Sequence, residues 1–467
     1  MTHNADFLLI ITLCLAVSYG WGMRGTTIGG EKGAMLPGAL IGLFTSMFCG
    51  VPLLYENCFV LCALGASGMY FGGCMTYGET LSFSMATRPA ENMKKGLFAL
   101  FVKGFLWFGV FGAVFSAGIS FYFSQYEKSR FILLCICLPI AAFLGRFIFN
   151  TGHGKKHSKP KIYFSKTRQE HWGAMLGILF VFTVDAALFK NVFTLTYSYI
   201  CALFGGFGWV IAQLFQVFSI HYAKDCKLLK FLKAGKSVSP WKIMECTLGF
   251  FGGLGAALGI IVTKPLLTDY LSGYAAFEAP ENNYYLVFVA IWLVLLCVDM
   301  IHYAFLNKNA DSDNKSVKKY LQLCEYFEPV LYAAFPMMMI FSKNALAARL
   351  TSFFLVFWVI VQEVCFEKLN GTKRSLCLKI LFSAFGIAAV AIEVFNINPL
   401  SPFATLIMYG AFYELITLLW IFEKLFRKKK ETAVPIFKQF INSEYITVHT
   451  YFCAVIALVT ILAAVFG

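Results

Sequence analysis

Residues 21–38 read WGMRGTTIGGEKGAMLPG and connect two long apolar segments, 7–23 and 35–55. The connection carries two cations, Arg24 and Lys32, whereas the next one, residues 56–57, carries none. The same alternation of basic and non-basic loops continues along the chain. Because cytoplasmic loops of membrane proteins are enriched in Lys and Arg, this pattern predicts both the number of spans and their orientation.

Fourteen apolar segments can be identified: 7–23, 35–55, 58–77, 96–120, 131–149, 172–189, 194–219, 244–263, 284–306, 327–342, 350–366, 375–395, 403–423 and 448–466. Loops after odd-numbered segments hold 30 of the 39 Lys and Arg residues, and loops after even-numbered segments hold 6. The sequence therefore predicts an all-α integral membrane protein with about fourteen transmembrane helices. It places the protein in the inner (cytoplasmic) membrane, with both termini on the outer side.

The composition agrees with a membrane protein. The chain is 59% hydrophobic and 14% charged, whereas an ordinary soluble domain has about 25% charged residues. No positively charged region precedes segment 7–23, so we expect a retained helix and not a signal peptide. The net charge of +14 is spread over short loops, which argues against nucleic acid and for contact with lipid headgroups.

Metal and cofactor sites are not expected. Most of the fifteen cysteines lie inside apolar segments, where they behave as small hydrophobic residues. The sequence has no CxxC pair and no Cys/His cluster with metal-ligand spacing. The glycine-rich stretch is not a phosphate-binding Walker loop, because Glu31 stands where that motif requires Lys.

Three short matches indicate an internal repeat. Residues 33–36 (GAML) recur at 173–176, residues 62–64 (CAL) recur at 201–203, and the pattern GVFG at 109–112 returns as GFFG at 249–252. The offset of 139–140 residues predicts two parallel four-helix units, 1–125 and 126–265, because each unit has an even number of helices. The remainder, 266–467, forms a six-helix region.

The glycine-rich connection between the first two segments is the main candidate binding site. Its glycines let backbone amides approach an anion, and the N-terminal dipole of the following helix points to the same place. We predict that it binds a carboxylate, phosphate or sulfate group of a small solute. The predicted contacts are Arg24, Gly25, Thr26, Thr27, Gly29, Gly30, Glu31 and Lys32. A tight cytoplasmic turn with packing glycines explains the same pattern equally well.

Charged residues inside or near the ends of segments form a second group of candidates, because charges in a bilayer face partners or water. Asp299 and His302 lie three residues apart on one helical face, which suits either a proton-relay pair or a pair at a helix interface. Further candidates for lining a solute cavity are Glu79, Arg146, Asp185 and Glu414. A solvated helix end is the other explanation for Glu79.

These features favour a secondary transporter of a small polar or anionic solute, coupled to an ion or proton gradient. An intramembrane enzyme, such as a transferase acting on a lipid-linked or acyl substrate, is a second class. The chain has only seven histidines, four of them in basic loops or at a loop edge, which weakens that class. A non-catalytic membrane assembly subunit is the third class of protein that fits these features.

Overall fold

The computed structural model describes residues 2–24, 30–73, 80–81, 89–123, 128–150, 164, 170–221, 239–272, 284–309, 314–317, 320, 327–342 and 344–362. Within these ranges the regular secondary structure is helical, without a β-strand. The predicted segments 375–395, 403–423 and 448–466 lie outside them.

The helices follow the predicted apolar segments closely. They are α1 (Thr2–Arg24), α2 (Gly30–Phe48), α3 (Pro52–Glu56), α4 (Cys58–Gly73), α6 (Pro89–Phe123), α7 (Lys128–Asn150), α8 (Trp172–Leu188), α9 (Val192–His221), α10 (Pro240–Ser272), α11 (Tyr284–Asn309), the π-helix η2 (Val330–Ala334), α13 (Phe335–Phe341) and α14 (Ala345–Gln362). Five of them, α1, α6, α7, α9 and α10, are long and apolar enough to cross a membrane. The described part is therefore compatible with a multi-pass membrane protein.

One predicted segment is divided. Segment 35–55 forms α2 up to Phe48 and then the short helix α3. Gly50 lies between them with a φ of +73°, a left-handed conformation that glycine adopts without strain. Pro52 then begins α3, as expected of a residue that fits the first turn of a helix.

Helices α1 and α10 pack antiparallel, and so do α7 and α8, as expected of a chain that crosses a layer repeatedly. Asp6 near the start of α1 lies 3.8 Å from Lys264 in the second half of α10, and Lys242 at the start of α10 donates to the Gly22 carbonyl near the end of α1. In α7 and α8 the contacts are likewise antiparallel: Asn150 accepts from the Gly173 amide at one end, and Arg130 pairs with Asp185 at the other.

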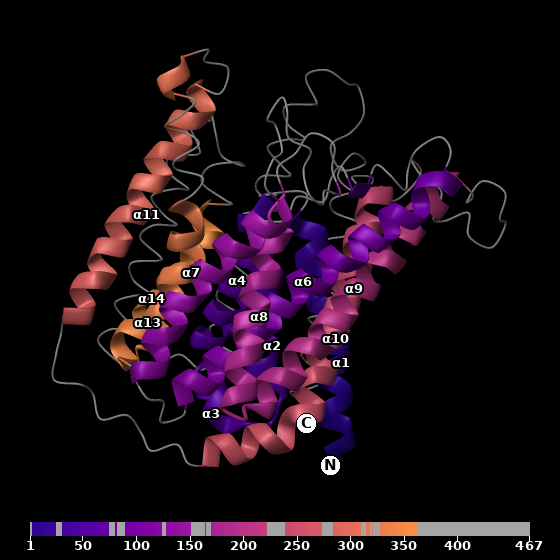
Figure 1. Cartoon of the computed structure of the whole chain (residues 1–467). Helices are drawn as coiled ribbons and strands as arrows, with labels where there is room; N and C mark the ends of the chain where they lie inside the picture. The colour runs from indigo at the N-terminus through magenta and orange to yellow at the C-terminus, as the bar shows by residue number, and fades with distance from the viewer. Residues whose placement is uncertain are drawn as a thin grey trace, which may run out of the picture.

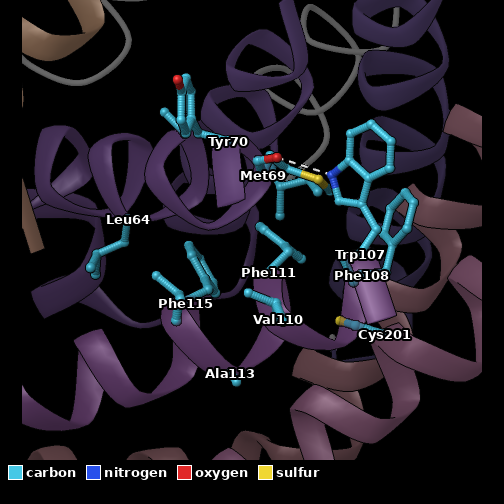
Figure 2. Close-up of a cluster of buried hydrophobic side chains, with 14 of the residues drawn as sticks. Leu64, Met69, Tyr70, Trp107, Phe108, Val110, Phe111, Ala113, Phe115 and Cys201 are labelled. Atoms are coloured by element: carbon cyan, nitrogen blue, oxygen red, sulfur yellow. Dashed lines mark hydrogen bonds between the residues drawn. The ribbon is translucent and has the colours of Figure 1, made fainter. Parts of the chain in front are cut away.

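Helix α4 is central to the bundle (Figure 1). Its residues are apolar on all sides, which is typical of a fully buried helix. Gly38 of α2 and Gly65 of α4 touch backbone to backbone, so a methyl group at either position would overlap the other glycine's carbonyl. Trp107 of α6 also contacts α4, donating from Nε1 to the Met69 carbonyl at 3.0 Å (Figure 2).

Helix α7 lies at the periphery and exposes apolar side chains along most of its length. The exposed ones are Ile132, Leu133, Ile136, Ile140, Phe143, Leu144, Phe147 and Ile148. A continuous apolar surface of this kind is what lipid tails cover in a membrane protein.

Candidate functional site: a buried charge cluster where α2 begins

Three charged side chains from distant parts of the chain meet where α2 begins. Lys32 Nζ lies 3.3 Å from Asp299 Oδ2 in α11 and 3.1 Å from Glu328 Oε1, in the turn before η2. The side chains of Lys32, Asp299 and Glu328 are 13%, 6% and 22% exposed. Because a buried charge is costly unless it is paired, Lys32 stabilises both carboxylates. We call them, together with His302, the charge cluster.

Two tyrosines hold the carboxylates in place. The Tyr332 hydroxyl donates to Asp299 Oδ2 at 2.6 Å, and the Tyr70 hydroxyl donates to Glu328 Oε2 at 3.4 Å. Their rings stack with centroids 5.5 Å apart, and Lys32 Nζ lies 4.9 Å from the centroid of the Tyr332 ring. Figure 2 shows the Tyr70 hydroxyl directed away from the apolar side chains of α4 and α6. Tyr70 and Tyr332 thus connect the apolar core to the charge cluster.

The π-helix η2 positions Tyr332. Its wider hydrogen-bond spacing leaves carbonyl groups without the usual helical partner, and such segments are common at functional sites. Two tertiary donors satisfy carbonyls here: Trp292 Nε1 donates to the Leu331 carbonyl at 2.8 Å, and Ser67 Oγ donates to the Tyr332 carbonyl at 3.3 Å. The irregular turn is therefore anchored to α11 and α4, the helices that carry Asp299 and Tyr70.

His302 lies next to the ion pairs on α11. It interacts electrostatically with both Asp299 and Lys32, and its ring contacts Tyr320 edge to face at 5.0 Å. The side chain is 5% exposed, and its Nε2 has no hydrogen-bond partner among the residues that the structure describes. A buried ring nitrogen in this state can accept or donate a proton if one reaches it.

Negative charge exceeds positive charge in the described part of the cluster. Asp299 and Glu328 face a single ammonium group, that of Lys32, and Glu31 adds a further negative charge that acts on Glu328. Such an excess favours binding of a proton or another cation. Lys32 lies in the first turn of α2, where the helix N-terminus adds partial positive charge.

Several predicted contacts of the glycine-rich stretch lie outside the described residues: Gly25, Thr26, Thr27 and Gly29, and also Glu79 and Glu414. Arg24 is the last residue of α1 and Gly30 the first of α2. The structure joins two separately predicted groups, since Lys32 of the glycine-rich stretch contacts Asp299 of the Asp299–His302 pair.

Asp185 does not lie in the charge cluster. It forms a two-pronged ion pair with Arg130, whose Nε lies 2.6 Å from Asp185 Oδ1. The guanidinium also lies 3.7 Å from the Phe189 ring centroid and 5.5 Å from that of Phe121. Phe121 marks the end of α6 opposite to the charge cluster, so Asp185 and Lys32 are separated by most of the length of α4. At 1.5 Å per residue this is roughly 20 Å.

Arg146 lies near the end of α7 and acts on His171, the residue before α8. Burial, and then the positive charge of Arg146, lower the pKa of His171 from 6.5 to about 4. His171 is therefore neutral at physiological pH. Arg146 therefore contributes to this local arrangement around His171.

A second buried ion pair fastens the polypeptide that precedes α8. Lys103 Nζ in α6 lies 2.5 Å from Glu170 Oε1 and 2.8 Å from Thr80 Oγ1, and the Lys103 and Glu170 side chains are 1% and 0% exposed. Glu170 Oε2 accepts from the Phe164 amide at 2.8 Å. Both charged groups in this network have partners, which is typical of an ion pair that stabilises the fold.

Sequence reasoning missed Glu328, Tyr70 and Tyr332. Glu328 is an acidic residue within predicted segment 327–342, which is the signal that could have identified it. Tyrosine is common in apolar segments, so Tyr70 and Tyr332 gave no such signal. Their role depends on a π-helix that apolar periodicity does not reveal.

Comparisons with protein-family models, curated proteins and solved structures found no match. Within the described ranges, no group of three His, Cys, Asp or Glu side chains is arranged to hold a metal ion.

Proposed function

We propose that the protein is a secondary transporter of a small polar or anionic solute, coupled to a proton or ion gradient across the inner membrane. The observation that carries this proposal is the ion-paired cluster of Lys32, Asp299 and Glu328 beside a π-helix. Ionisable groups buried among membrane helices mark substrate and ion pathways. Irregular helices at such sites are common in secondary transporters.

Lys32 is the proposed contact for the solute, and the two carboxylates are the proposed site of the coupling ion. An ammonium group that is shared by two carboxylates can exchange one of them for an anionic solute without becoming unpaired. This exchange would release a carboxylate to bind a proton or cation. The cluster thereby offers a physical link between solute binding and ion binding, which a transporter requires.

The finer topology is part of the proposal. Fourteen spans with both termini outside would place the basic loops 150–171 and 220–243 in the cytoplasm, in agreement with the positive-inside rule. Cysteine-accessibility labelling at residue 158 and at residue 467 tests it. We expect residue 158 to be labelled from the cytoplasmic side and residue 467 from the outer side; labelling of both from one side would refute the topology.

The parallel repeat of 1–125 and 126–265 also remains a proposal. Equivalent helices would be α2 and α8, α4 and α9, and α6 and α10. The helices that they pack against differ: α2 packs along α4, whereas α8 packs mainly against α7 and α6. A duplicated unit that later acquired different neighbours accounts for both the sequence matches and this difference.

Solute uptake distinguishes a transporter from an enzyme or an assembly subunit. Purified protein in proteoliposomes would be offered radiolabelled small carboxylates, phosphate and sulfate, with a pH gradient imposed. We expect uptake of at least one class by the wild type and loss of that uptake in Asp299→Asn. Glu56→Gln is the matched control, because Glu56 is an exposed carboxylate on α3. Absence of uptake for all three classes would contradict the proposal.

A further inference from the structure

The two carboxylates of the charge cluster are held unequally. Asp299 Oδ2 receives the Tyr332 hydroxyl at 2.6 Å as well as Lys32, and its side chain is 6% exposed. Glu328 receives Lys32 at Oε1 and only a long 3.4 Å hydrogen bond from Tyr70 at Oε2, and its side chain is 22% exposed. Hydrogen bonds to the charged form favour that form. Asp299 is therefore the more firmly held carboxylate, and Glu328 is the more exposed one.

The described side chains of the charge cluster carry more negative than positive charge. With Asp299 and Glu328 both ionised, Lys32 balances only one of these two negative charges. One proton on Glu328 would leave the single pair of Lys32 and Asp299, which is neutral. Because an uncompensated buried charge is much more costly than a neutral pair, the protonated state is favoured.

His302 provides the second, independent indication. Its buried Nε2 has no hydrogen-bond partner among the described residues, and it lies beside Asp299 and Lys32. With its ring proton on Nδ1, the imidazole offers a lone pair to a proton that arrives at the cluster. Within the described ranges, the other titratable groups facing the site are Glu31, Tyr70, Tyr320 and Tyr332, and none of the tyrosines supplies a positive charge.

We propose that the coupling ion is a proton and that Glu328 is the carboxylate that binds and releases it. This inference rests on the proposed function, since coupling is what the bound proton serves. In the proton-bound state Glu328 is neutral and its attraction to Lys32 weakens, so Lys32 pairs with Asp299 alone. Only Pro329 separates Glu328 from η2, so the release of Glu328 from Lys32 would act on the irregular turn that carries Tyr332.

Infrared difference spectroscopy on the purified protein tests this directly, because a protonated carboxyl and a carboxylate absorb at different frequencies. Spectra are taken between mildly acidic and mildly alkaline buffer, without solute. We expect the wild type to lose a protonated-carboxyl band on alkalinisation. The band should shift when ¹³C is placed in the side-chain carboxyl of glutamate but not of aspartate. It should disappear in Glu328→Gln, return in Glu328→Asp, and persist in the control Glu56→Gln.

A band that follows the aspartate label, that persists in Glu328→Gln, or that is absent from the wild type would overturn the inference. The measurement needs no solute, so its outcome is separate from that of the uptake assay. Uptake without a Glu328 proton would leave a transporter coupled to another ion. If Glu328 binds a proton but no solute class is taken up, the transporter proposal is contradicted and the assignment of the proton site stands.

Discussion

Lys32 and Asp299 are 267 residues apart in sequence, and their Nζ and Oδ2 atoms lie 3.3 Å apart in the bundle. Glu328 completes the contact from a third segment, so one ammonium group holds three parts of the chain together. The contact joins the start of α2 to α11 and to the helix that contains η2. Its removal should therefore affect both the stability of the fold and the proposed coupling.

We expect Lys32→Gln to destabilise the protein far more than Glu328→Gln does. Loss of Lys32 leaves Asp299 and Glu328 without the cation they share, and breaking a buried pair on one side costs about 3–5 kcal/mol. Loss of Glu328 leaves the balanced pair of Lys32 and Asp299. The midpoint of thermal unfolding in detergent would show the order, and equal midpoints for the two variants would contradict the cluster.

The contact between Arg130 and Asp185 should act on stability alone. Asp185→Asn removes the ionised partner of a buried guanidinium, for which we again expect about 3–5 kcal/mol of destabilisation. Arg130→Gln combined with Asp185→Asn should cost less than the sum of the single changes, because both charges are then removed together. A double-mutant cycle of unfolding midpoints measures this, and strict additivity would show that the pair does not interact.

Close packing of α2 on α4 predicts intolerance of a single methyl group. In Gly38→Ala the new methyl would overlap the Gly65 backbone carbonyl, which cannot move aside as a side chain can. We expect at least about 1–3 kcal/mol of destabilisation from overpacking. Gly109→Ala is the matched control, because its nearest neighbour is a Leu179 side-chain methyl at 3.0 Å. A Gly38→Ala variant as stable as Gly109→Ala would argue against this helix contact.

His171 should make stability depend on pH. The pKa of His171 is about 4 in the folded protein and 6.5 when unperturbed. Below pH 6.5 the unfolded chain therefore binds a proton that the folded protein does not bind. Its contribution therefore destabilises the fold as pH falls from 6.5 to 4, and does not change further below that range. His171→Gln should flatten this part of the unfolding-midpoint profile, whereas an unchanged profile would show that His171 is not buried in its neutral form.

Much of the helical framework could be predicted from the sequence, because a long apolar segment leaves the backbone few options besides a helix. Segments 131–149 and 194–219 match α7 and α9 to within three residues at each end. The break at Gly50 was missed, since a positive φ at glycine has no signal in hydropathy. The fourteen spans as a set, their sides and the repeat stay predictions.

The charge cluster itself could be predicted only in parts. Lys32, Asp299 and His302 were recognisable as unusual residues near apolar segments, but their meeting depends on how α2 and α11 pack. Asp185 looked equally unusual and has its partner, Arg130, at the other end of the bundle. Sequence spacing within one helix indicates neighbours, whereas contacts between helices far apart in the chain follow from tertiary packing.

Proton movement during solute uptake tests the central claim most directly. Proteoliposomes that contain a pH-sensitive dye would receive the small carboxylates, phosphate and sulfate one class at a time. We expect that the class taken up by the wild type also moves protons, and that Asp299→Asn abolishes this movement while Glu56→Gln retains it. If Asp299→Asn moves as many protons as the wild type, or if uptake by the wild type proceeds without proton movement, the cluster of Lys32, Asp299 and Glu328 is not a proton-coupling site.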